Sequence, residues 1–353
     1  MKISAFLATS TIALCIAVLH ACTPSVADRV EPLGEVAERE MLHLAKTYPG
    51  RMAGHTAENQ AADYLASRFM EMGYATRKIR FETNYNFRAD QARTIKVTST
   101  NVVAARQGSS DKQIIIGAHF DTAIPESTDD VRQRIGGPLL QGLDDNASGV
   151  GVLLELAERL RTVKPDHTVI FVAFGAEEIG SKGAYHFSQA MTPKQRASTL
   201  WMINIDSVIA GDRLYFHAGQ EVSKETPDAG IARDRALQIA KSLKIPADTN
   251  PGLNPKYPRG TGCCSDQEAF DAVGIPTLTV EATNWQLGDR DGYQQTSKRP
   301  AFPEGESWHR HDLDSIEHLQ RALPGRVPQR ARETVQILLP LIQELANAEP
   351  LKK

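Results

Sequence analysis

The sequence has few cysteines and no excess of charge of either sign. Its 353 residues include 4 Cys, and two of them lie within the first 22 residues. Disulfides therefore cannot be the basis of the fold, which must rest on a hydrophobic core. Lys and Arg number 40 against 43 Asp and Glu, so no nucleic acid is expected as a partner. With 41% hydrophobic and 24% charged residues, the chain is typical of a globular protein, which excludes disorder and coiled coil.

Beyond the N-terminus, the sequence also lacks any apolar run of the roughly 20 residues that a membrane span requires. The first residues differ, because a short positive start is followed by apolar, small and hydroxylic residues up to Leu19. This pattern is typical of an export signal. Leu-His-Ala-Cys at residues 19–22 resembles a bacterial lipobox, which predicts a signal over residues 1–21 and a lipid on Cys22 as the link to a membrane.

Ser25-Val26-Ala27 offers a competing cleavage site, after which the mature protein would be soluble. Both alternatives predict export, with the mature protein either periplasmic or anchored by lipid to the cell envelope. Residues 28–353 then form the folded part, and the sequence shows no repeat or low-complexity linker that would divide it.

Short apolar runs separated by helical patterns determine the expected fold. Four nearly continuous runs, which suit strands buried on both faces of a sheet, lie at residues 114–116, 169–174, 201–205 and 277–280. Shorter strand-like segments lie at residues 76–81 and 101–105. Apolar residues at helical spacing mark residues 34–47, 57–72, 150–160, 229–243 and 331–346, with a kink expected at Pro340. We therefore expect one large α/β domain with a mixed, mostly parallel sheet covered by helices on both faces.

Three of the predicted strands lead into residues that can bind a metal ion. These residues are His119 and Asp121 after the first run, Glu177 and Glu178 after the second, and Asp206 after the third. In an open α/β sheet the carboxyl ends of parallel strands face the same crevice, so these side chains should converge. Burying several carboxylates together without a cation is very unfavourable, and mixed His and carboxylate ligands suit zinc or a similar divalent ion. The polar stretch 121–141 is expected to be a loop near the mouth of this site.

Asp144 and Asp145 add two carboxylates directly before the helix predicted to begin near Ser148. A helix N-terminus favours a carboxylate, so capping could account for one of them, and Ser148 is itself expected to cap the helix. Capping does not account for His119 or for the acids at the other strand ends.

Taken in order, these motifs resemble those of the co-catalytic di-zinc aminopeptidases of peptidase family M28. The segments that carry the resemblance are His119-x-Asp121, residues 144–149, Glu177-Glu178, Asn204-Ile205-Asp206 and Trp308-His309. Further segments, at residues 49–52, 250–254, 260–264 and 280–285, resemble one branch, the alkaline phosphatase isozyme conversion aminopeptidases. The resemblance implies a zinc-exopeptidase fold, peptide or protein N-termini as substrates, and a preference for basic residues such as Arg.

The same resemblance implies a role for each candidate residue. Two zinc ions would be held by five side chains: His119 and Asp206 on one ion, Glu178 and His309 on the other, and Asp145 between them. Glu177 would be the general base for a water held by the two ions. Asp121 would accept the imidazole N–H of His119 and orient the ring. His311 is a second candidate for the last ligand, although Trp308-His309 matches the branch better.

Other chemistries have less support in the sequence. It contains no His-Glu-x-x-His and no Gly-x-Ser-x-Gly. A single-zinc glutaminyl cyclase or a carboxypeptidase could use the same fold, and a surface-binding lipoprotein is the non-enzymatic alternative. Cys263 and Cys264 are adjacent, and in an oxidising compartment they are candidates for a vicinal disulfide or two free thiols. The sequence predicts an exported zinc aminopeptidase.

Overall fold

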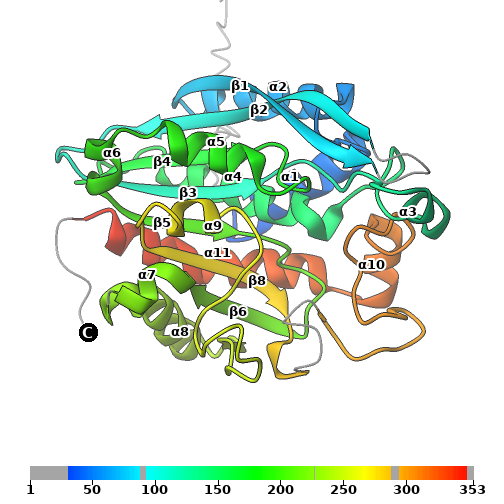
Figure 1. Ribbon diagram of the computed structural model, residues 1–353. Helices are drawn as coiled ribbons and strands as arrows, with labels where there is room; N and C mark the ends of the chain where they lie inside the picture. Colours follow the sequence, from blue (N-terminus) through cyan, green and yellow to red (C-terminus); the bar gives the residue numbers. More distant parts are fainter. Residues whose placement is uncertain (1–30, 88–92, 226, 288–293, 348–353) are drawn as a thin grey trace, which may run out of the picture. The chain divides into compact units, whose positions relative to one another are not determined.

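An eight-stranded mixed sheet runs through the molecule (Figure 1). The computed structural model describes residues 31–87, 93–225, 227–287 and 294–347. The strands are β1 (Ala75–Phe87), β2 (Arg93–Arg106), β3 (Gln113–His119), β4 (Thr168–Phe174), β5 (Thr199–Ile205), β6 (Arg213–Ala218), β7 (Ala247–Asp248) and β8 (Thr277–Thr283). Their spatial order is β1-β2-β4-β3-β5-β8-β6-β7. The parallel centre comprises β4, β3, β5 and β8, while β1, β2 and β6 pair in antiparallel fashion on its flanks.

Helices cover both faces of this sheet. They are α1 (Glu35–Thr47), α2 (Thr56–Glu71), α3 (Thr128–Gln133), α4 (Gly149–Leu160), α5 (Lys182–Ala190), α6 (Pro193–Ser198), α7 (Gln220–Glu225), α8 (Ile231–Leu243), α9 (Glu268–Asp271), α10 (Ile316–Ala322) and α11 (Arg326–Leu345). The described residues from Leu33 onward form one compact unit. The predicted export signal and Cys22 lie outside the described residues. Among the residues that are described, no helix is both long and apolar enough to cross a membrane.

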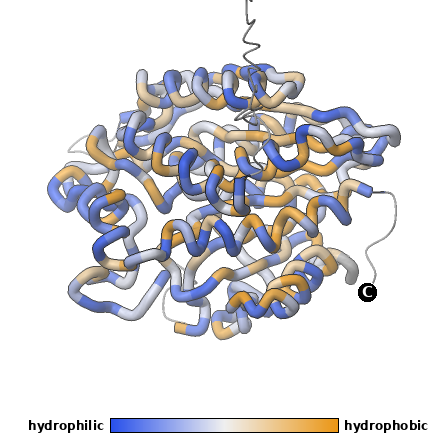
Figure 2. Tube along the Cα trace, turned by 180° about the vertical axis from the view of Figure 1, so that it is seen from behind, coloured by the Kyte–Doolittle hydropathy of each residue, from blue (hydrophilic) through white to orange (hydrophobic). Residues whose placement is uncertain are grey.

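The core explains why the central strands are apolar on both faces. Ile114 and Ile116 of β3 pack on one face with buried residues of α1, α2, α4, α8 and α11. Ile115 points to the other face, where it packs with residues of α5 and α9. In Figure 2, hydrophobic and hydrophilic residues alternate along the outer helices, as expected of helices with one buried side. Burial on both faces is what gives the strand its continuous apolar sequence.

The predicted fold class is confirmed, with differences at the edges of the sheet. β1 and β2 are longer than predicted, because their outer halves pair as an exposed hairpin that needs backbone hydrogen bonds rather than apolar side chains. β6 and the two-residue β7 were not predicted. α11 begins at Arg326 and continues through Pro340. The stretch 121–141, predicted to be a loop, contains the short helix α3.

Candidate metal centre

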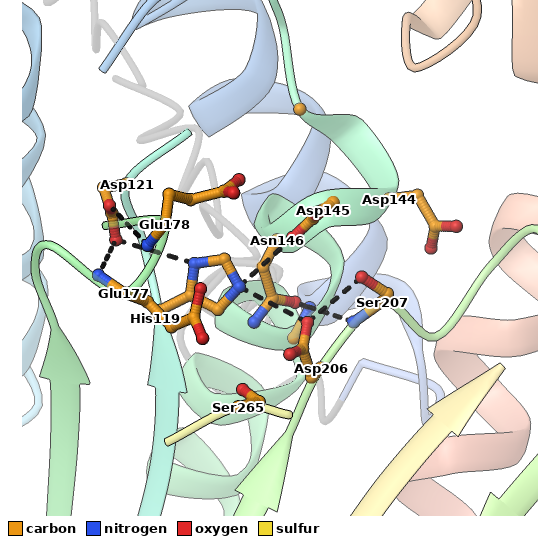
Figure 3. A network of polar contacts seen from close by, with 12 residues as sticks. His119, Asp121, Asp144, Asp145, Asn146, Glu177, Glu178, Asp206, Ser207 and Ser265 are labelled. Carbon is orange, nitrogen blue, oxygen red and sulfur yellow. Dashed lines mark hydrogen bonds and ion pairs between the residues drawn. The ribbon is translucent and has the colours of Figure 1, made fainter. Parts of the chain in front are cut away.

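The predicted site residues meet beyond the carboxyl ends of the parallel strands. His119 ends β3, Asp206 directly follows β5, and the turn after β4 carries Glu177 and Glu178. Figure 3 shows His119 in the middle of this network, with Asp121 on one side and Asp145 and Asp206 on the other. Because these strands are adjacent in the sheet, residues distant in sequence come together at one edge.

Each of two histidines lies close to two carboxylate oxygens. His119 Nε2 is 3.1 Å from Asp145 Oδ1 and 3.3 Å from Asp206 Oδ1. His309 Nε2 is 3.2 Å from Asp145 Oδ2 and 3.1 Å from Glu178 Oε2. These contacts define two groups able to hold a metal ion, and Asp145 is common to both. The two oxygens of Asp145 therefore belong to different groups.

The donor atoms fit zinc in type and in spacing. Nitrogen and oxygen ligands lie about 2.0–2.2 Å from zinc, so neighbouring ligands of a tetrahedral site are about 3.3–3.5 Å apart. The four nitrogen–oxygen distances, 3.1 to 3.3 Å, come close to that spacing. Three carboxylates packed against two histidines would also leave a buried negative charge, which a divalent cation offsets.

The charges of the two groups depend strongly on one another. Burial lowers the pKa of His119, but the neighbouring carboxylates of Asp206, Asp121 and Asp145 outweigh this effect and raise that pKa well above its ordinary value. Burial also raises the pKa of Asp145, yet hydrogen bonds from His119 and His309 hold it well below its usual range. Asp145 is therefore a buried anion, as a bridging carboxylate must be.

The loop that carries Asp145 is held by residues to which sequence reasoning gave no role. The two oxygens of Asp314 accept the backbone N–H groups of Asp144, at 2.7 Å, and of Asp145, at 3.0 Å. The buried guanidinium of Arg51 donates to backbone carbonyl oxygens at Gln141 and Gly142. Asp314 follows the Trp-His-Arg-His segment closely in sequence, and that position was the only signal that could have indicated its role.

The predicted capping role of Ser148 is wrong, and Asp144, for which capping was one alternative, has other partners. The carboxylate of Asp144 instead accepts the backbone N–H groups of Ile209, at 2.7 Å, and Ala210, at 3.1 Å. Ser148 Oγ donates to the carbonyl oxygen of Asp144 and accepts the N–H of Val208, so it makes no capping hydrogen bond to α4. The cause is the segment after β5, which packs against this loop. Its backbone N–H groups bond to the side-chain oxygens of Asp144 and Ser148 that a helix cap would need.

The turn after β4 is held by Asp121. Its two oxygens accept the backbone N–H groups of Glu177, at 2.9 Å, and Glu178, at 3.2 Å. Asp121 Oδ1 is also 3.6 Å from His119 Nδ1, close to the predicted partner but beyond hydrogen-bond length. Ser181 Oγ donates to Glu177 Oε1 at 3.0 Å. Burial raises the pKa of Glu177 well above its usual value, as suits a group that must accept and release a proton.

A pocket of about 450 Å³ opens over both groups. Its lining includes the metal-group residues and Glu177 as well as Cys263, Cys264 and Trp285. The two cysteines are joined by a disulfide, which was one of the two predicted alternatives. His311 belongs to neither metal group of the described residues, and its backbone N–H donates to the carbonyl oxygen of Arg134 at 3.2 Å.

Comparisons with known proteins show which family and which relatives this chain resembles. The family model described as Peptidase family M28 matches residues 101–335. The chain is 48% identical over 319 residues to the alkaline phosphatase isozyme conversion protein of Escherichia coli (strain K12). The alignment covers 89% of this chain and 91% of that protein. It is 25% identical over 227 residues to aminopeptidase YwaD of Bacillus subtilis (strain 168), covering 64% of this chain and 41% of that protein.

Solved structures share the fold at lower sequence identity. A zinc aminopeptidase from Bacillus subtilis aligns with a TM-score of 0.67 and 16% identity, covering 92% of this chain and 98% of that one. A glutaminyl cyclase from Porphyromonas gingivalis aligns with a TM-score of 0.61 and 19% identity, covering 88% and 98%. These structural alignments show the fold alone.

Proposed function

The chain belongs to peptidase family M28 and is a zinc-dependent aminopeptidase, and from this premise we propose that it uses two zinc ions and acts outside the cytoplasm. The observation that carries the two-ion proposal is the position of Asp145. One of its oxygens lies beside His119 and the other beside His309. A carboxylate shared in this way supports two ions held next to each other.

In this proposal the ligands divide as the two groups do. His119 and Asp206 hold one ion, Glu178 and His309 hold the other, and Asp145 is shared. Bound zinc supplies Lewis acidity, which polarises the scissile carbonyl and lowers the pKa of water. Asp121 keeps Glu177 and Glu178 in place through their backbone N–H groups, so each carboxylate can do its separate task.

Glu177 is proposed as the general base. It lines the pocket beside His119, and Ser181 donates a hydrogen bond to Oε1. Glu177 takes a proton from the attacking water and gives it to the nitrogen of the leaving amine as the peptide bond breaks. The hydrogen bond from Ser181 fixes the side chain and leaves Oε2 for the proton.

We further propose that the preferred N-terminal residues are basic, notably Arg, as the resemblance to the alkaline phosphatase isozyme conversion branch implies. Export is proposed from the apolar N-terminal segment and the Leu-His-Ala-Cys sequence at residues 19–22. Mass spectrometry of the mature N-terminus tests export. A lipid on Cys22 supports anchoring, a start at residue 28 supports a soluble form, and an intact Met1 in cell-envelope fractions contradicts both.

Glutaminyl cyclase is the second candidate, because enzymes of that activity share the fold. One assay separates the two functions. Purified protein is incubated with and without zinc, first with a panel of aminoacyl-anilides and then with a peptide that begins with Gln. Release of the N-terminal residue supports the aminopeptidase, whereas loss of ammonia without cleavage supports the cyclase.

A further inference from the structure

The pocket over the metal centre contains carboxylates that neither metal group uses. Six acidic residues line it, with neither Lys nor Arg among the described lining residues. Four of the six are the carboxylate ligands and Glu177, and two divalent ions would offset their four charges. Glu268 and Glu281 remain. The charge of Lys256, which is not in the lining, acts on Glu268, whereas no cation in the lining offsets Glu281. A substrate side chain that carries a positive charge would complete the balance.

Glu281 is held firmly in this pocket. It lies in β8, and its Oε1 accepts a hydrogen bond from Trp285 Nε1 at 2.6 Å. His217 Nε2 is 3.0 Å from the same oxygen. The backbone N–H of Asn250 donates to His217 Nδ1 at 3.3 Å, so Nδ1 is an acceptor and the ring proton is on Nε2, where it is donated to Glu281. Two donors on one oxygen fix the orientation of the carboxylate.

The second oxygen of Glu281 is available to a ligand. No described residue donates a hydrogen bond to Oε2, and 15% of the side chain is exposed. Oε2 therefore offers an acceptor that needs no rearrangement of the protein before it binds a donor.

The surroundings of Glu281 make a charge pair there stronger than one at the surface. Trp285 is buried and packs with Tyr215, Tyr257 and Cys263. The ring of Trp285 lies 5.5 Å from that of Tyr257 and 5.2 Å from that of His217, in edge-on arrangements. A wall of packed aromatic side chains excludes water and lowers the local dielectric constant. A guanidinium, planar and weakly hydrated, suits such a site better than an ammonium does.

Glu268 differs from Glu281 although both line the same pocket. Its side chain is exposed, and one oxygen accepts the backbone N–H of Cys264 at 3.1 Å. Water and salt screen an exposed carboxylate, so its attraction for a substrate cation is weak. Glu268 is therefore a control of the same residue type in the same pocket, with a more exposed side chain and without the two side-chain donors that hold Glu281.

We propose that Glu281 is the specificity-determining residue, which selects an N-terminal residue with a cationic side chain, a guanidinium above all. The assignment rests on the aminopeptidase function proposed above. In it, Oε2 of Glu281 accepts the hydrogen bonds of the guanidinium, while Trp285 and His217 hold the carboxylate from its other oxygen.

The test compares the anilides of arginine and citrulline, which differ by the charge of the guanidinium but have nearly the same shape. kcat/KM is measured for the zinc-loaded wild type, Glu281→Gln and Glu268→Gln. We expect the wild type to favour arginine over citrulline about 10- to 100-fold, since a charged hydrogen bond to a largely enclosed carboxylate discriminates to that degree. Glu281→Gln should reduce this ratio at least about tenfold, whereas Glu268→Gln should keep it within about threefold.

Zinc content and the thermal unfolding midpoint show whether Glu281→Gln is folded. If Glu281→Gln binds less zinc than the wild type or unfolds at a much lower temperature, Glu281→Asp is tested in its place. An arginine-to-citrulline ratio near one in the wild type, or a ratio that Glu281→Gln leaves unchanged, would overturn the assignment while leaving the aminopeptidase in place. A larger fall in Glu268→Gln than in Glu281→Gln would also overturn it. Failure of the wild type to hydrolyse any aminoacyl-anilide would overturn the proposed function and the assignment together.

Discussion

Asp145 Oδ2 lies 3.2 Å from His309 Nε2. This contact connects the segment before α4, which carries Asp145, with the segment between β8 and α10, which carries His309. This contact distinguishes His309 from its neighbour His311, which belongs to neither metal group among the described residues. Because the proposed second ion depends on a chain segment outside the strands, its occupancy can be changed without disturbing the sheet.

His309→Ala should therefore lower zinc content from two ions per chain toward one and reduce kcat at least about 100-fold, since the proposed second site loses its only nitrogen ligand. His311→Ala is the matched control and should keep its zinc. Metal analysis by mass spectrometry, run beside a rate assay on both variants, checks the pair. Zinc loss in His311→Ala and not in His309→Ala would give the ligand role to His311.

Asp145→Ala should lose both ions, because this carboxylate offsets charge in each group. The expected result is less than about one zinc per chain after dialysis, a more severe loss than replacing either histidine causes. Zinc titration by calorimetry gives the number of sites and their affinities. Two tightly bound ions in this variant would show that Asp145 is not the bridge.

Glu177→Gln should bind both ions and lose about 10²- to 10⁴-fold in kcat, the usual contribution of a general base. The amide keeps the shape of the side chain and can still accept the hydrogen bond from Ser181, so KM should change little. Steady-state kinetics on the zinc-loaded variant separate kcat from KM. Near-normal turnover would place the base elsewhere.

Asp314→Asn should weaken zinc binding about 10- to 100-fold, although Asp314 is a ligand of neither ion. An amide has a single acceptor oxygen and cannot receive both N–H groups of Asp144 and Asp145, so the loop that carries the bridging carboxylate shifts. Excess zinc should restore activity in this variant and not in Asp145→Ala. Unchanged zinc affinity would show that Asp314 does not position the loop.

The sequence predicted the strand ends well because strands buried on both faces have continuous apolar sequences. His119 and Asp206 stand directly after such runs, so the order of the strands was enough to bring them together. The exposed hairpin of β1 and β2 left a weaker pattern, since its outer residues alternate without burial.

Tertiary contacts account for what the sequence did not predict. Asp314 reaches Asp145 across 169 positions, and a lone acid after a histidine-rich segment has no local pattern that indicates this. Capping, which was one alternative for Asp144, is replaced by tertiary contacts for the same kind of reason, because the N–H groups of Ile209 and Ala210 approach it from another strand end. The local sequence indicates which hydrogen bonds a side chain is able to make. Which of them form depends on the segment that packs beside that side chain in the fold.

The number of zinc ions per chain tests the central claim most directly. The chain is purified, stripped with a chelator, shown to be inactive, and titrated with zinc while bound metal and the rate on an aminoacyl-anilide are measured together. We predict that binding saturates at two ions per chain and that full activity appears only when the second ion is bound. Saturation at one ion per chain, with full activity, would contradict the shared role of Asp145 and the two-ion mechanism built on it.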